Sequence, residues 1–362
     1  MMDPLLADLG FSHCLGIGPM TYSLLIDRFA TAEKAYNAST EDLRAVIGEA
    51  LTREFLKFRA VFHPHKKLQE YKSKDVLVLS RRSILYPHTL LTLQDAPICL
   101  YVKGDISQFS LNEARLLGVV GTRKPTSYGV QVTKMLVEQL VAEGWVIVSG
   151  LAIGIDATAH RTALDNGGKT IAFLGCGVNI MYPYENADLY RRMKELNGLI
   201  ISEFPPDMTV KRGMFISRNR LISGLSRGVL VIEGSGTSGA LATARYAAVQ
   251  GRDVFATPAP ITSAQSQAPN ILLKEGAIVV TCGNDILDAY NLTQARSTGE
   301  VSHSFTDKQE QDIYRLLQQE CLRSDDIAHK LEVSIATVLQ TLSELEMKGV
   351  VRQNIAGEYE LC

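Results

Sequence analysis

The cysteines of this 362-residue sequence form no C-x-x-C pair and show no regular spacing. That absence argues against a zinc site and a disulfide framework, and it is typical of thiols kept reduced in the cytoplasm. The first ten residues, MMDPLLADLG, contain two aspartates where a secretory signal needs basic residues. No apolar run approaches the roughly 20 residues that span a bilayer. We therefore expect a soluble cytoplasmic protein without a metal or a membrane contact.

An excess of positive charge is also absent, since the formal net charge is −2. The charges are unevenly distributed, however. Residues 1–75 contain ten basic and ten acidic side chains, whereas residues 306–362 contain six basic and eleven acidic ones. Residues 208–227, MTVKRGMFISRNRLISGLSR, carry five basic side chains and no acidic one. This segment, the basic patch, is the candidate surface for a polyanion.

A chain of this length exceeds what one core usually organises, so we expect several domains. Residues 1–72 have short helical patterns around a turn at Gly16, Gly18 and Pro19, and this arrangement is typical of a helix-hairpin-helix or SAM-like domain. The amides of such a turn can meet a phosphate. Equally, the turn can simply link two packed helices, because the segment has no basic excess.

Residues 73–290 alternate apolar β-branched runs with amphipathic helices, a pattern that predicts an α/β fold with a Rossmann-like, doubly wound and mostly parallel sheet. Ligands of such sheets bind beyond the carboxyl ends of the strands. The expected strands are VLVL, ICLYV, LLGVVG, WVIVS, TIAFLG, GLIIS, VLVIE, DVFAT and AIVVT.

After a polar linker at 291–305, residues 306–362 have the outline of a winged-helix domain. The second helix of its helix-turn-helix begins near Ser334 and carries polar and acidic residues where a DNA reader would carry lysine or arginine. Because a duplex repels acidic groups, partner binding is favoured over DNA reading for this domain. The residues concerned are Gln340, Ser343, Glu344 and Glu346, with Glu358 and Glu360 in the wing.

Two glycine motifs resemble cofactor sites but fail on their context. Gly234, Gly236 and Gly239 form G-x-G-x-x-G after a late strand, and no acidic residue closes the next strand to bind a ribose. In NGGKT, residues 166–170, the strand follows the lysine instead of preceding the loop. We therefore expect no cofactor. What remains is a rim of glycine amides and a helix start near Ser238 that can bind an anion, with glycines 150, 154, 175, 234 and 239.

Within the basic patch, Lys211 and Arg212 precede Phe215, and Arg218 and Arg220 follow it. Cations that follow a backbone, together with an aromatic ring that stacks on a base, are the chemistry of single-strand binding. Alternatively, Phe215 belongs to the core. Arg218 and Arg220 lie two positions apart, so on a helix they point to different faces, and one of them can pair internally with Glu203 or Glu233.

Catalysis is a further alternative. Asp156 and His160 are four residues apart, so they share a helix face and could form an acid/base pair. A structural role is favoured, in which Asp156 suits the helix dipole and His160 hydrogen-bonds back to it. Asp156, Glu203 and Glu233 could gather a magnesium ion, but no two are adjacent and the basic patch balances them. A binding role is therefore favoured over catalysis.

Six ordered segments together resemble the family of the DNA-processing protein DprA, also called Smf. They are GTRKPTSYG, SGLAIGIDATAH, GCGVNIMYP, SEFPP, FISRNRLISGLS and EGSGTSGALATARYA, between residues 121 and 247. The resemblance implies sequence-independent binding of single-stranded DNA, homodimerisation, and help in loading the RecA recombinase during natural transformation. By this resemblance, Arg123 would bind a phosphate of the DNA backbone and Phe215 would stack on a base. Lys211 and Arg212 would line the DNA-binding groove. The full DNA-binding set that we expect is Thr122, Arg123, Gly150, Lys211, Arg212, Phe215, Arg218, Asn219, Arg220, Ser238, Gly239 and Asn270.

The sequence departs from the family pattern at two places. Thr122 replaces the usual serine of G-S-R and keeps a hydroxyl. Ala259 and Ala268 stand where the family usually has glycines, and because alanine disfavours a positive φ, the loop before Asn270 is expected to follow another path. A competing function, from the residues alone, is an enzyme or sensor for a nucleotide-derived small ligand, because a rim of amides binds any phosphate. A small ligand needs one or two cations, whereas DNA needs a line of them.

Overall fold

A computed structural model of the chain describes residues 3–112, 115–211, 213–292, 307–317, 322–347, 350–353 and 357–361. Two compact units are present, Met1–Leu292 and Thr293–Cys362, each with its own hydrophobic core. In the described part of the chain, no helix is long and apolar enough to cross a membrane.

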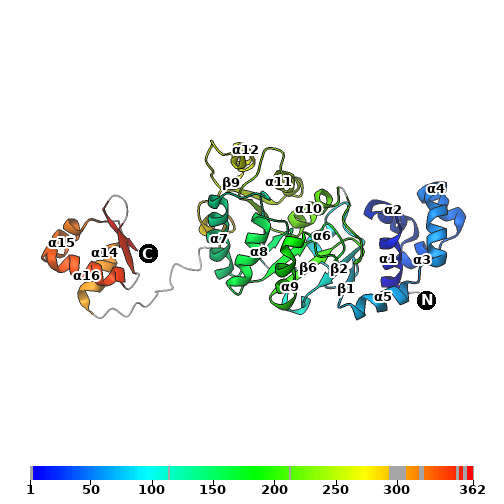
Figure 1. The fold of residues 1–362 in the computed structure, drawn as a ribbon, viewed down its shortest axis with the longest axis horizontal. Helices are drawn as coiled ribbons and strands as arrows, with labels where there is room; N and C mark the ends of the chain where they lie inside the picture. The colour runs from blue at the N-terminus through cyan, green and yellow to red at the C-terminus, as the bar shows by residue number, and fades with distance from the viewer. Residues whose placement is uncertain are drawn as a thin grey trace. The chain divides into compact units, whose positions relative to one another are not determined.

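Five helices open the first unit: α1 (Pro4–His13), α2 (Pro19–Phe29), α3 (Ala32–Tyr36), α4 (Thr40–Val61) and α5 (Pro64–Ser73). Three of their starts follow from capping, since the side chains of Asp3, Thr31 and Ser39 each accept a hydrogen bond from an amide of the first turn. The helices lie beside the β1 edge of the sheet (Figure 1). The expected domain boundary at residue 72 lies one residue before the end of α5. It stays a prediction, because the helices and the sheet share one core.

A nine-stranded sheet follows, and each of its strands overlaps one of the nine apolar runs identified in the sequence, with β1, β2 and β7 each extending one residue beyond the run. Its order is β1-β2-β6-β5-β4-β3-β7-β8-β9, and it is parallel except where β2 pairs antiparallel with β1 and β6. The predicted mostly parallel, Rossmann-like sheet is confirmed. The strands are β1 (Leu77–Ser80), β2 (Cys99–Lys103), β3 (Leu116–Val120), β4 (Val146–Ser149), β5 (Thr170–Phe173), β6 (Gly198–Ser202), β7 (Gly228–Val231), β8 (Asp253–Ala256) and β9 (Ile278–Val279).

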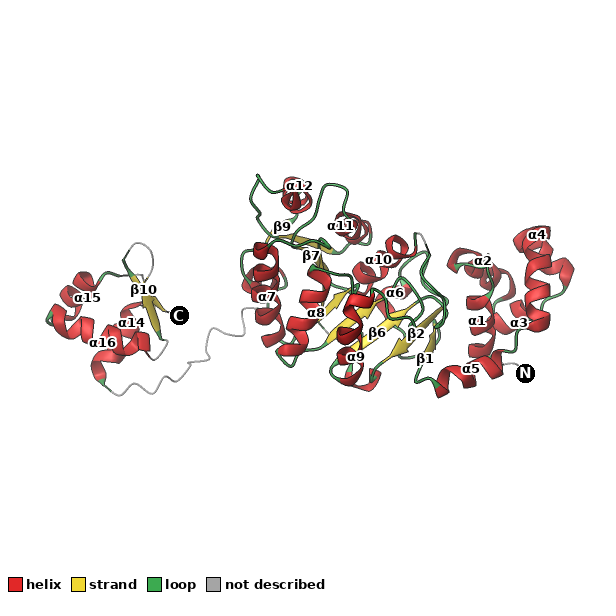
Figure 2. Cartoon of the chain, viewed as in Figure 1, coloured by secondary structure: helices red, strands yellow, loops and turns green. Residues whose placement is uncertain are grey.

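Helices cover both faces of this sheet (Figure 2). Side chains alternate along each strand, so Ile171 and Phe173 share a core with residues of α10, whereas Ala172 faces the opposite core. This double burial is why the central strands, β3 to β7, are continuously apolar. The helices are α6 (His88–Leu91), α7 (Ser127–Ala142), α8 (Ile155–Asp165), α9 (Ala187–Glu195), α10 (Met214–Leu225), α11 (Gly239–Val249), α12 (Gln267–Lys274) and α13 (Gly283–Ala289), with 3₁₀ turns at Ile106–Gln108, Tyr184–Asn186 and Ala264–Ser266.

The second unit has the predicted winged-helix outline. It comprises α14 (Lys308–Leu317), α15 (Ser324–Leu331), α16 (Ile335–Met347) and a hairpin of β10 (Val351–Gln353) and β11 (Tyr359–Leu361). Ile313, Ile327 and Val338 form its core. On α16, Gln340 donates to Glu344 (3.3 Å) and Glu346 is exposed. The Glu360 side chain and the predicted linker 291–305, apart from Asn291 and Leu292, lie outside the described residues.

Candidate functional site

The order of the sheet creates a topological switch between β3 and β7. From β3 the chain proceeds outward to β4, β5 and β6, then returns to place β7 on the other side of β3 and continues to β8 and β9. The connections after β3 and β7 therefore diverge, and a crevice opens between them at the carboxyl ends of the strands. A pocket of about 400 Å³ occupies this position, and we call it the switch-point pocket.

Four segments distant in sequence line this pocket: the turn after β3, the loop after β4 with the start of α8, the first turns of α10, and the start of α11. Most of the sequence-predicted DNA-binding residues meet here. The predicted residues that line it are Thr122, Arg123, Phe215, Arg218, Asn219, Ser238 and Gly239. Because these segments are separated along the chain, only the return of the chain to β7 brings the residues together.

Arg123 lies exposed at the pocket, and its guanidinium carbon is 5.7 Å from the centroid of the Phe215 ring. Among the described residues, none forms an ion pair with Arg123, so its charge is available to an anion. Gly154 allows the turn after β3, which carries Arg123, to pack closely against the backbone at the start of α8. A Cβ on Gly154 would lie 2.4 Å from the carbonyl oxygen of Thr122. The Thr122 hydroxyl accepts the Lys124 amide (3.1 Å) and so braces the turn.

Phe215 lies half-buried on the pocket wall. A Cβ on Gly175, which follows β5, would come within 2.6 Å of the Phe215 ring, so that glycine leaves room for the ring. Gly175 therefore has a packing role in this structure. The other neighbour of the ring is Tyr182, with centroids 5.4 Å apart. The ring therefore has both a core side and an open side, and its stacking role stays a prediction.

Arg218 lies beneath the pocket and is only 3% exposed. Its guanidinium donates to the carbonyl oxygens of Gly150 (2.7 Å) and Phe173. A Cβ on Gly150 would lie 2.4 Å from this guanidinium, so Gly150 makes space for the arginine and is not itself among the pocket residues. Burial lowers the pKa of Arg218 to about 10, and the nearby Asp156 opposes that change. Arg218 is thus a fixed cation under the site.

Arg220, two positions along α10, points elsewhere. Its Nε lies 2.5 Å from the carboxylate of Asp95 and its Nη2 lies 2.8 Å from that of Glu203. This is the internal pairing with Glu203 that the two-residue helical spacing allows. Arg220 is consequently not among the residues of the switch-point pocket, and its side chain is held inside the fold.

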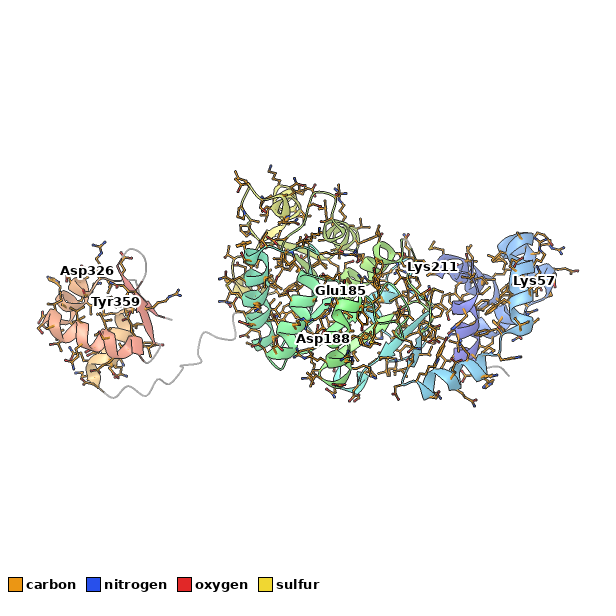
Figure 3. All side chains as sticks on the ribbon, in the orientation of Figure 1. Lys57, Glu185, Asp188, Lys211, Asp326 and Tyr359 are labelled. Atoms are coloured by element: carbon orange, nitrogen blue, oxygen red, sulfur yellow. The ribbon has the colours of Figure 1, made fainter. Side chains whose placement is uncertain are left out.

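Lys211 is exposed but lines a second pocket of about 410 Å³, together with Gly16, Gly18 and Pro19 of the N-terminal turn. Figure 3 shows it on the side of the sheet that carries the N-terminal helices. Arg212 lies outside the described residues. Asn270 is also separate, and its side-chain amide donates to the Ala259 carbonyl (3.3 Å).

The alanines that replace family glycines do not strain the 258–270 loop. Neither Ala259 nor Ala268 is among the residues with a positive φ. Ala268 is fully buried on the first turn of α12. Alanine is therefore compatible with the path that the loop takes.

The predicted bond from His160 to Asp156 is not the one that forms. Asp156 accepts the amides of Gly150 (3.1 Å) and Ala152 (3.4 Å). His160 Nε2 accepts the Leu151 amide (3.3 Å), and its Nδ1 lies 2.6 Å from the Thr170 hydroxyl, which itself donates to the Ile147 carbonyl (2.8 Å). His160 is therefore neutral with its proton on Nδ1. Burial lowers its pKa to about 3.

The three carboxylates considered for magnesium are each committed to a different partner. Glu203 pairs with Arg220, Asp156 holds the loop amides, and Glu233 accepts from the amide (2.9 Å) and hydroxyl (2.5 Å) of Thr126. In the described ranges, no group of three or more His, Cys, Asp or Glu side chains could hold a metal ion.

Comparison with known proteins agrees with this fold. Residues 77–291 match the family described as DNA recombination-mediator protein A, and residues 300–355 match the DprA winged helix domain. The DNA processing protein DprA of Bacillus subtilis is 36% identical over 254 residues, which cover 68% of this chain and 84% of that protein. Protein Smf of Escherichia coli is 38% identical over 274 residues, covering 74% of this chain and 72% of that protein.

Two solved structures have the same fold. DprA from Streptococcus pneumoniae superposes with a TM-score of 0.68 at 31% identity, covering 79% of this chain and 98% of that chain. A Helicobacter pylori DprA structure, described as giving insight into a single-stranded DNA binding mode, superposes with a TM-score of 0.53 at 31% identity over 60% of this chain and 95% of that chain. By the extent of these matches, this chain belongs to the DNA recombination-mediator protein A family, whose members are named DprA or Smf.

Proposed function

We propose that this protein binds single-stranded DNA without sequence preference, protects it, and helps load the RecA recombinase onto it during natural transformation and recombination. In this proposal it acts in the cytoplasm by binding alone, without turnover or a cofactor, and as a homodimer formed through the Rossmann-like domain. Family membership supports the role, and so does the single-stranded DNA binding mode described for DprA of Helicobacter pylori.

One observation supports it most. The switch-point pocket combines an exposed cation, Arg123, with a half-exposed aromatic ring, Phe215, over a buried cation, Arg218. A single strand is bound through cations that contact its phosphates and aromatic rings that stack on its bases, and Arg123 and Phe215 provide one of each within a short distance. The first turn of α11, which begins at Gly239, adds backbone amides at the positive end of a helix dipole, although the amide of Leu241 already donates to the Ser238 hydroxyl. None of these groups reads the edge of a base, so binding should be independent of sequence.

Salt titration tests the proposal against a small nucleotide ligand. Arg123 and Lys211 are the exposed cations of the proposed set among the described residues, and they lie at different pockets. Each phosphate contact with a single strand contributes a slope of about −0.7 in log K against log salt. We expect a slope of about −1.4 or steeper for oligothymidine. A slope near zero, or tight binding of a mononucleotide with no gain for the polymer, would contradict it.

Dimerisation and RecA loading rest on the family alone and need their own measurements. Size-exclusion chromatography coupled to light scattering measures the molar mass of the protein in solution. We expect twice the monomer mass of 39.7 kDa. RecA assembly on protein-coated single strands should be faster with this protein present than without it. We also propose residues 1–72, 73–290 and 306–362 as separate functional modules, with 73–290 sufficient for the DNA contact.

A further inference from the structure

Phe215 has an aromatic neighbour that the sequence did not single out as a functional residue. The ring of Tyr182 lies 5.4 Å from that of Phe215, centroid to centroid, with the planes tilted by 36°. Tyr182 is 42% exposed, although aromatic side chains usually bury most of their surface. The guanidinium of Arg123 lies over the ring of Phe215. Arg123, Phe215 and Tyr182 are therefore successive neighbours.

The loop that carries Tyr182 is held firmly in place. It follows β5 and is tied to the 205–208 segment, because the amide of Gly177 donates to the Met208 carbonyl (2.8 Å) and that of Asn179 donates to the Pro206 carbonyl (2.8 Å). The hydroxyl of Tyr190 on α9 donates to the carbonyl of Val178. A ring on a braced loop loses little conformational entropy when a ligand stacks on it, so the contact contributes more to affinity.

We propose that Tyr182 is a second base-stacking residue, so that two successive bases of a single strand lie on Phe215 and Tyr182. This rests on the proposed function. The 5.4 Å between the rings exceeds the roughly 3.4 Å axial spacing of nucleotides along one strand of duplex DNA, and thus suits bases that are splayed apart. The tilt of 36° between the planes means that the two rings do not form a parallel stack with each other.

Charge limits how far this aromatic track extends. Tyr184 is even more exposed, at 80%, but it has no ring contact with Phe215 among the described side chains. Beyond it along the chain lie Glu185 and Asp188, which are labelled in Figure 3 and are both exposed. Asp188 pairs with Arg161 at 2.8 Å, whereas no ion pair is formed by Glu185 among the described residues. Carboxylates repel the phosphates of a strand, so the track ends at Tyr182 and Tyr184 serves as a matched control.

The test compares full-length variants on oligothymidine at fixed salt. Tyr182→Ala should weaken binding about 5- to 150-fold, which is the effect of losing one stacked base, with an unchanged salt slope. On an oligomer of equal length made of abasic sites, the same variant should bind like the wild type, because only phosphates remain to be contacted. Tyr184→Ala should bind both oligomers like the wild type.

A gain of signal provides the second measurement. Trp145 is the only tryptophan and is 1% exposed, so it contributes a steady background. Tyr182→Trp keeps an aromatic face, and we expect near wild-type affinity with quenching of the new fluorescence when oligothymidine binds. Quenching should be absent with the abasic oligomer.

The inference is overturned if Tyr182→Ala binds oligothymidine as the wild type does, if it loses equally on the abasic oligomer, or if Tyr182→Trp shows no quenching upon binding. The proposed function is contradicted by a different result, namely that the wild-type protein does not bind oligothymidine. The two failures are therefore distinguishable in one set of titrations.

Discussion

The guanidinium of Arg123 lies over the ring of Phe215, with 5.7 Å between its central carbon and the ring centroid. The two residues are 92 positions apart in sequence, one after β3 and the other on the first turn of α10. At this distance the cation and the ring attract each other and hold each other in position. A phosphate and a base could therefore be bound by one preorganised unit.

Arg123→Ala should weaken the binding of all single-stranded sequences alike, because a phosphate contact carries no sequence information. The salt slope should become less negative by about 0.7, the loss of one contact. Fluorescence anisotropy with oligothymidine and a mixed sequence at several salt concentrations measures both. Lys124→Ala is the matched control, since Lys124 is exposed and is not among the pocket residues. Equal effects of the two variants would reduce Arg123 to a general surface charge.

Phe215→Ala should lower affinity by about 1–3 kcal/mol while leaving the salt slope unchanged, because stacking neutralises no phosphate. The Phe215→Leu variant distinguishes the stacking of the ring on a base, which affects DNA affinity, from its packing in the fold, which affects stability. Leucine restores apolar volume against Gly175 but offers no flat face, so affinity should stay low while the melting temperature recovers. If Phe215→Leu recovers both properties, the ring belongs to the core alone.

The stability of the first unit should fall with acid through His160. Its folded pKa of about 3 lies below the ordinary 6.5, so the unfolded chain binds more protons between these values. Stability is therefore fully present above pH 6.5 and is lost as pH falls, by about 1.4 kcal/mol per pH unit for this residue. The structural cause is direct, because protonating Nε2 would set an N–H against the amide of Leu151.

Urea unfolding between pH 7 and pH 5 measures this effect. The His160→Gln variant should show a shallower decline of the unfolding free energy with falling pH than the wild type, whatever its starting stability. His13, whose pKa burial lowers to about 4, contributes in the same direction in both proteins and cancels in the comparison. Parallel declines in the two proteins would exclude His160 as an acid-sensitive group.

Removing the second unit by ending the chain at Leu292 should leave the affinity for single-stranded DNA nearly unchanged. The two units have separate cores, so the remaining part should fold. Residues 306–362 are acidic, and α16 carries Glu344 and Glu346 where a DNA reader carries basic residues. Anisotropy titration of both proteins measures the difference. A tenfold or greater loss of affinity on truncation would show that the winged helix contributes to the DNA contact.

Local sequence was a good guide wherever a short segment carries its own signal. The apolar runs predicted the nine strands of the sheet, most clearly β3 to β7, because a strand that is buried on both faces carries apolar residues throughout instead of alternating with polar ones. The two-residue spacing of Arg218 and Arg220 predicted that they point to different faces of a helix, and the pairing of Arg220 with Glu203 is one of the internal pairings that this spacing left open. The motifs that follow β3 and β7, and the motif on α10, could also be identified in the sequence, and they contain most of the residues that line the switch-point pocket.

What could not be predicted depends on how distant segments pack. Lys211 and Phe215 are four residues apart, yet they line different pockets, because Gly213 takes a left-handed turn (φ 90°) between them. Gly150 leaves room for the buried Arg218, which its own segment does not reveal, and its expected contact with the ligand stays a prediction. Tyr182 was missed as a functional residue because nothing in its own segment shows that β5 and α10 place its ring beside Phe215.

The amino-acid sequence by itself determined the strands, the helices, the family and the residue types available to bind an anion, because these depend on local patterns of polarity and on short motifs. Only the tertiary structure decided which cations stay exposed and which are consumed by internal carboxylates and carbonyl groups. The physical reason is that burial and pairing of a charge depend on groups brought from elsewhere in the chain, and the sheet order sets which groups those are.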